Sequence, residues 1–212
     1  PSLELTLKDA RNTQAYVDFF RRHRVRVVNM SFGGSVGGVE EQLEQCGIGA
    51  NADERRKIAR EWFDIGKDAF VRAMASAPEV LFVAAAGNEN ADSSFAESIP
   101  ADIVLPNLIT VGAVDKAGDE APFTSYGKTV VVHANGYLVD SVIPGGERLA
   151  ESGTSMSAPQ VTNLAAKILA VNPALTPPQV IAIIRETAEK TADGRRVLIH
   201  PRKAIAAAQA KQ

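Results

Sequence analysis

The chain contains a single cysteine, Cys46, in 212 residues, so it has no internal disulfide and no cysteine-based metal site. No apolar run approaches the roughly 18 residues that a membrane-spanning helix requires. Neither sign of charge is in excess, because 23 basic and 25 acidic residues are well mixed and leave a net charge of −2. Without a basic face, the chain is not expected to bind nucleic acid or an anionic membrane.

The first residues also lack the features of a targeting segment. Pro1 is not an initiator methionine, and no positively charged start precedes an apolar core. We therefore interpret the chain as trimmed, and its localisation stays open. Its length and its 45% content of hydrophobic residues suit one domain with a large core rather than two domains.

Helical periodicity alternates along the chain with short buried-strand patterns. This alternation predicts an α/β fold, in which a mostly parallel sheet carries helices on both faces. The strand 25–31 is short and β-branched, which is typical of a central parallel strand. Strands are expected over 25–31, 80–86, 108–114 and 130–133, and helices over 8–24, 52–76, 155–172, 176–188 and 201–211.

The segment 151–159 has the pattern of a nucleophile elbow. Apolar periodicity begins just after Ser155, which places this serine at a helix N-terminus. Free backbone N–H groups and the helix dipole favour negative charge there by about 0.3–1 kcal/mol, so an oxyanion beside Ser155 would be stabilised. Alternatively, Ser152, Thr154 or Ser155 only caps the helix.

The string from Gly153 to Pro159, G-T-S-M-S-A-P, resembles the serine segment of subtilisin-like proteases, the subtilases. This resemblance implies that Ser155 is the nucleophile of a serine endopeptidase that works through an acyl-enzyme, and that Thr154 binds substrate. The sedolisin proteases share the G-T-S core, so this motif alone does not separate the two groups.

A second motif separates them. The buried strand 80–86 ends in the string A-A-A-G-N-E, which resembles the subtilase segment whose asparagine amide donates to the oxyanion, whereas sedolisins have aspartate in this role. The resemblance implies that Asn88 is catalytic. It also implies that Ala85, Ala86 and Gly87 line the pocket for the substrate side chain preceding the cut.

A third motif, N-M-S-F-G-G, resembles the subtilase segment that pairs with an extended peptide, which implies substrate-binding roles for Ser31, Phe32 and Gly33. The resemblance covers most of residues 25–210 except about 35–57, which we interpret as a surface insertion near the rim of the substrate cleft. After the strand 130–133, the A-P-G of the family is replaced by Ala134-Asn135-Gly136, so the local turn departs from the family pattern.

A serine hydroxyl needs a base, normally a histidine oriented by an aspartate. Subtilases supply these residues upstream, in D-T/S-G and H-G-T-H strings, and neither string occurs in the chain. His23, His133 and His200 lack the family context and order, so surface or packing roles are expected for them. The chain is therefore expected to be the C-terminal portion of a catalytic domain and to be inactive alone. Its sheet is expected to be incomplete at its N-terminal side, with missing strands at the end that the absent segment would complete. Its expected partners are a polypeptide substrate and the missing N-terminal segment.

Other readings remain open. A non-catalytic α/β binding or scaffold domain derived from a subtilase would keep the same motifs, whereas a nucleotide-binding domain would need a G-x-G-x-x-G or Walker string, which is absent. No cofactor or metal is expected. Asp115, Asp119 and Glu120 lack the regular spacing of a cation site and suggest an acidic turn, although a structural calcium stays possible. A typical subtilase parent would be secreted or periplasmic.

Overall fold

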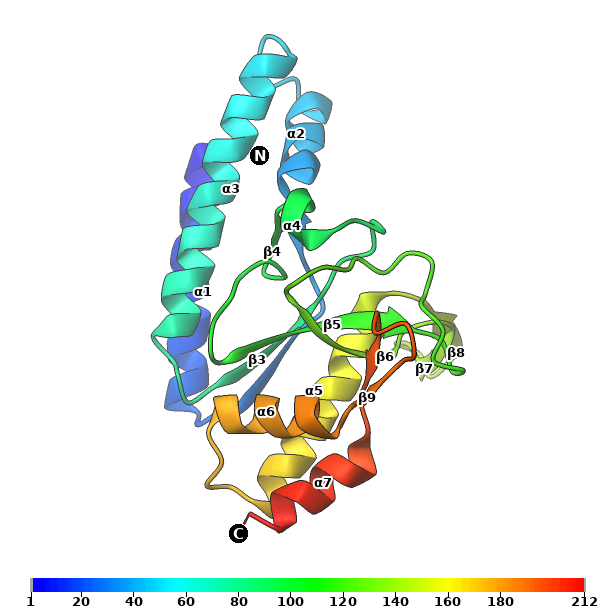
Figure 1. The fold of residues 1–212 in the computed structure, drawn as a ribbon. Helices are drawn as coiled ribbons and strands as arrows, with labels where there is room; N and C mark the ends of the chain where they lie inside the picture. The colour runs from blue at the N-terminus through cyan, green and yellow to red at the C-terminus, as the bar shows by residue number, and fades with distance from the viewer. Residues whose placement is uncertain (1, 212) are drawn as a thin grey trace.

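A computed structural model describes residues 2–211, and a six-stranded sheet forms their centre (Figure 1). The strands follow the order β1-β3-β5-β6-β10-β9, in which all neighbours are parallel except the pair β9 and β10. The predicted α/β class with a mostly parallel sheet is therefore confirmed. The strands are β1 (Val27–Met30), β3 (Leu81–Ala85), β5 (Leu108–Val114), β6 (Val130–Asn135), β9 (Glu189–Lys190) and β10 (Val197–Leu198).

The first strand, β1, lies at the end of the strand order and not at its centre, where it was predicted. β1 pairs with β3 on one side, and within residues 2–211 no strand pairs with its other side. The expectation of a central strand was therefore wrong for the described chain, because composition reports burial of the two faces of a strand but not which strand pairs with each edge.

Helices cover both faces of the sheet, as predicted (Figure 1). Side chains of a strand alternate between its faces, so Leu81, Val83 and Ala85 pack in one core while Phe82 and Ala84 pack in the other. The first core lies against α5 (Thr154–Val171), α6 (Pro177–Thr187) and α7 (Pro201–Gln209), and the second lies against α1 (Leu3–Arg22) and α3 (Ala52–Ala75).

Capping residues explain where two of the predicted helices begin in the structure. α3 begins where predicted, because the Asn51 side chain accepts a hydrogen bond from the backbone N–H of Glu54 (2.9 Å). α1 begins earlier than the predicted residue 8, because the Ser2 side chain caps it by accepting from Leu5 N (3.2 Å).

Residues 35–57 form a helix, a turn and the start of α3. The helix is α2 (Val36–Gln45), whose Ser35 cap accepts from Gly38 N (3.1 Å) and whose Leu43 is fully buried. α2 and the N-terminal part of α3 lie side by side and project beyond the sheet (Figure 1). The interpretation of this segment as an insertion stays a prediction.

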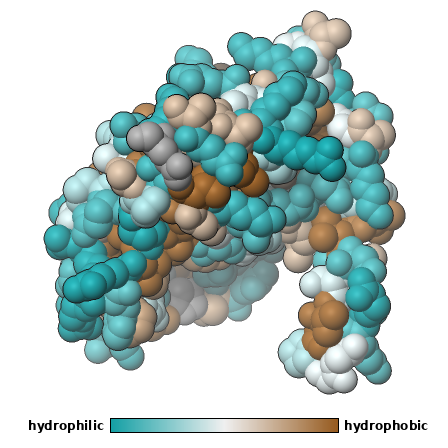
Figure 2. Space-filling view, turned by 90° about the horizontal axis from the view of Figure 1, so that it is seen from below, coloured by the Kyte–Doolittle hydropathy of each residue, from teal (hydrophilic) through white to brown (hydrophobic). Residues whose placement is uncertain are grey.

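Smaller elements complete the chain. β2 (Gly34–Ser35) pairs antiparallel with β4 (Ser98–Ile99), close to the short helix α4 (Ser93–Ala96). β7 (Val139–Val142) and β8 (Arg148–Glu151) form an exposed hairpin. Figure 2 shows a lobe projecting at the lower right, on the side where Figure 1 places this hairpin, and a hollow between the lobe and the rest of the molecule. Within residues 2–211, no helix is both long and apolar enough to cross a bilayer.

Candidate active site

The carboxyl ends of β1 and β3 meet at one edge of the sheet, where α5 also begins. Such an edge is where open parallel sheets place their binding sites. A cavity of about 320 Å³ lies there, and most of the predicted site residues line it: Phe32, Gly33, Ala85, Gly87, Asn88, Thr154 and Ser155. Of the remaining predicted residues, Ala86 is buried and Ser31 contacts Ser155 beside the cavity.

Ser155 lies in the first turn of α5 and is partly buried. Its Oγ donates a hydrogen bond to the carbonyl oxygen of Ser31 (3.3 Å), while Ser31 Oγ donates to the carbonyl oxygen of Ser155 (2.7 Å). This reciprocal pair fixes the start of α5 to the end of β1. The Ser155 hydroxyl is thereby held beside the segment expected to align a peptide.

The amide of Asn88 is oriented by Thr154. Asn88 Oδ1 accepts from the backbone N–H of Thr154 (2.8 Å) and from Thr154 Oγ1 (3.0 Å). Because a backbone N–H can only donate, the amide oxygen must face Thr154 N, and the Nδ2 group is turned away from that donor. Thr154 Oγ1 also accepts from Gly87 N (3.1 Å), so this buried threonine ties the β3 turn to the serine segment.

This role of Thr154 was not predicted, since the resemblance implied only substrate binding. Its position directly before the serine, with a hydroxyl that both donates and accepts, was the available signal. The arrangement places a serine hydroxyl near two kinds of N–H donor, which are the Asn88 amide and the backbone at the start of α5.

The turn after β6 supports the serine segment despite its departure from the family string. Gly153 N donates to Gly136 O (2.8 Å), and Ser157 Oγ donates to Ala134 O (3.0 Å). A Cβ on Gly136 would overlap Ser157 Oγ and lie 2.7 Å from Gly153 O. Glycine is therefore needed at this close approach, and the chain keeps it.

We expect Gly136→Ala to lower the free energy of unfolding by about 1–3 kcal/mol, because the added methyl group must displace the start of α5. Urea denaturation of the chain checks this value. Gly34→Ala is a matched control, since a Cβ there would meet no atom within 4 Å. Equal stability of the two variants would contradict the close approach.

The three histidines have structural contacts. His133 is 5% exposed, and its Nδ1 accepts from Val197 N (3.2 Å). His200 caps α7 by accepting from Lys203 N (3.3 Å), and the His23 ring lies 4.2 Å from that of Phe19, centroid to centroid. These contacts agree with the predicted packing and surface roles.

Burial lowers the pKa of the His133 imidazole below its usual 6.5, and the nearby Glu120 carboxylate partly offsets this shift. Below pH 6.5 the unfolded chain therefore binds a proton that the folded chain does not, so stability should fall as the pH falls below 6.5 toward the folded pKa. Urea denaturation between pH 7.5 and 5.5 checks this dependence. His133→Gln should flatten the decline and the exposed His23→Gln should retain it, whereas the same decline in both variants would assign it to another group.

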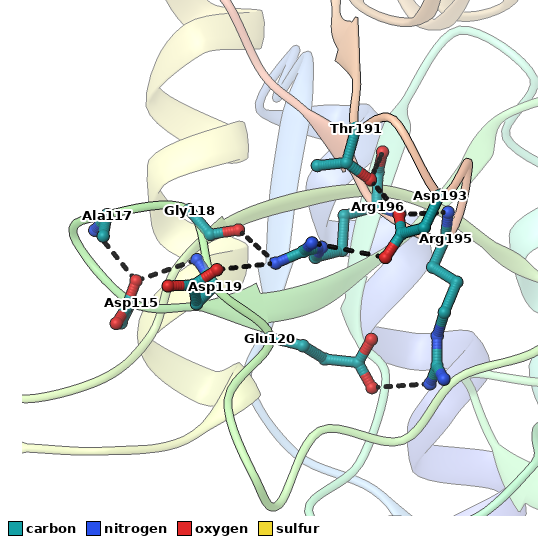
Figure 3. Close-up of polar contacts among 9 residues, drawn as sticks. All are labelled: Asp115, Ala117, Gly118, Asp119, Glu120, Thr191, Asp193, Arg195 and Arg196. Atoms are coloured by element: carbon teal, nitrogen blue, oxygen red, sulfur yellow. Dashed lines mark hydrogen bonds and ion pairs between the residues drawn. The ribbon is translucent and has the colours of Figure 1, made fainter.

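The acidic turn at 115–120 is paired with arginines (Figure 3). Arg195 Nη2 donates to Glu120 Oε1 (2.9 Å), and Arg196 Nη1 donates to Asp119 Oδ1 and to Gly118 O, both at 3.0 Å. Asp115 Oδ1 accepts from two backbone N–H groups of its own turn. These contacts fasten the β9–β10 hairpin to the turn. Within residues 2–211, no group of His, Cys, Asp or Glu residues is arranged to hold a metal ion.

The fold is a mostly parallel α/β sheet, and a serine hydroxyl and an asparagine amide lie at one cavity at its edge. Comparison with known proteins agrees, because the family model described as the subtilase family matches residues 3–200. The chain belongs to the subtilase family.

Similar proteins include subtilisin of Bacillus pumilus, which is 39% identical over 113 residues, or 53% of this chain and 39% of that protein. Alkaline elastase YaB of Bacillus sp. (strain YaB) is 31% identical over 170 residues, covering 77% of this chain and 42% of that protein. A cold-adapted subtilisin-like serine proteinase of known structure is 26% identical with a TM-score of 0.61, covering 89% of this chain and 60% of that one. The chain thus spans less than half the length of these two relatives and 60% of that structure.

Proposed function

We propose that the chain is the nucleophile and oxyanion-binding part of a serine endopeptidase. The observation that carries this proposal is the convergence of the Ser155 hydroxyl, the Asn88 amide and a cavity at the joined ends of β1 and β3. A non-catalytic scaffold would have no need of an asparagine amide oriented by two hydrogen bonds beside a serine hydroxyl.

In the proposed reaction, an extended peptide lies along Ser31 to Gly33 and presents its carbonyl carbon to Ser155 Oγ. Attack forms the C–O bond of a tetrahedral intermediate, and the carbonyl oxygen takes the negative charge. The Asn88 Nδ2–H and the free N–H groups at the start of α5 stabilise that charge. Collapse of the intermediate expels the amine and leaves an acyl-enzyme, which water hydrolyses. The proton of Ser155 must pass to a histidine from outside this chain, which then gives it to the leaving amine as the C–N bond breaks.

One edge of β1 pairs with no strand among residues 2–211, and this edge is the proposed place for the segment that supplies the aspartate and the histidine. Its backbone N–H and C=O groups can accept a further strand, as an unpaired edge does. A mostly apolar cavity of about 370 Å³ lies beside this edge, between β1, α1 and α3. Among the residues lining it are Tyr16, Phe20, Met30 and Phe32, of which Tyr16 and Phe32 are exposed. Apolar side chains of the added strand would fill it and cover these rings.

A protein that carries this chain together with its upstream coding sequence tests the proposal. A fluorophosphonate should modify Ser155, located by mass spectrometry, and peptide hydrolysis should disappear in Ser155→Ala. The scaffold alternative predicts an upstream sequence without aspartate and histidine motifs, no labelling and no hydrolysis.

A further inference from the structure

The cavity beside Ser155 has an outer wall that no motif indicated. α2 contributes Gly38, Val39 and Gln42 to its lining, in addition to the residues that follow β1 and β3. A second cavity of about 240 Å³ lies between α1, α2 and α3, and Val39 and Gln42 line it as well. The face of α2 that carries these two residues therefore separates two neighbouring cavities.

This wall is held in place from several sides. At its start, β2 pairs with β4, and the Ser35 cap binds Gly38 N. Along its length Leu43 is fully buried, and Glu44 forms an ion pair with Arg55 of α3 (3.1 Å). These contacts connect α2 to β4 and to α3.

The charged and polar groups that line the cavity favour some substrate side chains over others. Of the described residues around the cavity, only Glu89 carries an ionisable side chain, and Gln42, Ser35 and Ser98 add polar groups. One Glu89 oxygen accepts from Ser125 Oγ (3.2 Å), and a carboxylate has acceptor sites for further donors. Glu89 is exposed. A substrate carboxylate would meet its like charge, whereas an ammonium or guanidinium group would find acceptors.

We propose that α2 is a specificity element of this site. Val39 and Gln42 form the wall that, with Glu89, selects a lysine or arginine side chain preceding the scissile bond. This inference rests on the proposed function. Gln42 supplies an amide oxygen to the end of the bound side chain, Glu89 supplies the opposite charge, and Val39 contacts the aliphatic stem.

The test uses the full-length protein that contains this chain and four peptides that differ only in having Lys, Leu, Ala or Glu before the cut. The Lys peptide should exceed the Glu peptide in kcat/KM by at least about tenfold. Gln42→Leu should lower kcat/KM for the Lys peptide about tenfold, because an apolar group replaces the acceptor, and should leave the Leu peptide within about twofold. Glu89→Gln should remove the discrimination against the Glu peptide.

Gln45→Leu is the matched control, because Gln45 is exposed on the same helix and lines neither cavity. Gln42 is exposed as well, so neither change removes a core side chain, and thermal melting of each variant verifies this. Equal kcat/KM for all four peptides, or equal effects of Gln42→Leu and Gln45→Leu, would overturn the inference and leave the proposed function standing. Absence of any Ser155-dependent hydrolysis would instead overturn the proposed function and this inference with it.

Discussion

Asn88→Ala should lower kcat about 10²–10³-fold in the protein that contains this chain, with KM nearly unchanged. In the proposed reaction the amide donates to a charge that exists in the transition state and not in the bound peptide, so its loss should raise the barrier without weakening binding. The size of the effect is the one known for subtilisin, a member of the same family, when one oxyanion donor is removed. Steady-state kinetics with a peptide substrate measures both parameters.

A second variant separates donation from positioning. Asn88→Asp keeps an oxygen that accepts from Thr154 N, so the turn stays tied to the serine segment, but an ionised carboxylate has no N–H to donate. We expect the Asp variant to lose at least as much kcat as the Ala variant. A kcat near the wild-type value in either variant would remove Asn88 from the oxyanion site.

Much of the fold was predictable because it depends on local patterns. The strand over residues 80–86 is a continuous apolar run, and helix α3 begins directly after its capping residue Asn51. Both therefore lie close to their predicted positions. The position of β1 was not predictable, because pairing at a strand edge depends on which other segments are present and leaves no mark in the strand itself.

The site, like the fold, was predictable only where local sequence patterns mark it. Ser155 and Asn88 were identified by strings that lie far apart in the chain, and the structure brings both to one cavity. Residues 35–57 were expected near the rim of the substrate cleft, but Val39 and Gln42 were not predicted as lining residues, because they belong to no motif and reach the cavity through the β2–β4 pairing and the packing of Leu43. Contacts of this kind depend on tertiary structure, which a resemblance restricted to motifs does not contain.

The chain of 212 residues alone should neither react with a fluorophosphonate nor hydrolyse peptides above a Ser155→Ala control. In subtilisin, removing one member of the triad costs about 10⁴–10⁶ in kcat, and here neither the aspartate nor the histidine motif is present. Ser155 Oγ donates to a backbone carbonyl, which cannot take its proton at neutral pH, so the hydroxyl should stay protonated.

Circular dichroism first establishes that the chain is folded, and labelling is then followed with and without a separately produced aspartate and histidine segment. Labelling that appears only when the segment is added would support the proposed completion of the site by that segment, whereas turnover by the chain alone that disappears in Ser155→Ala would show that it contains its own base.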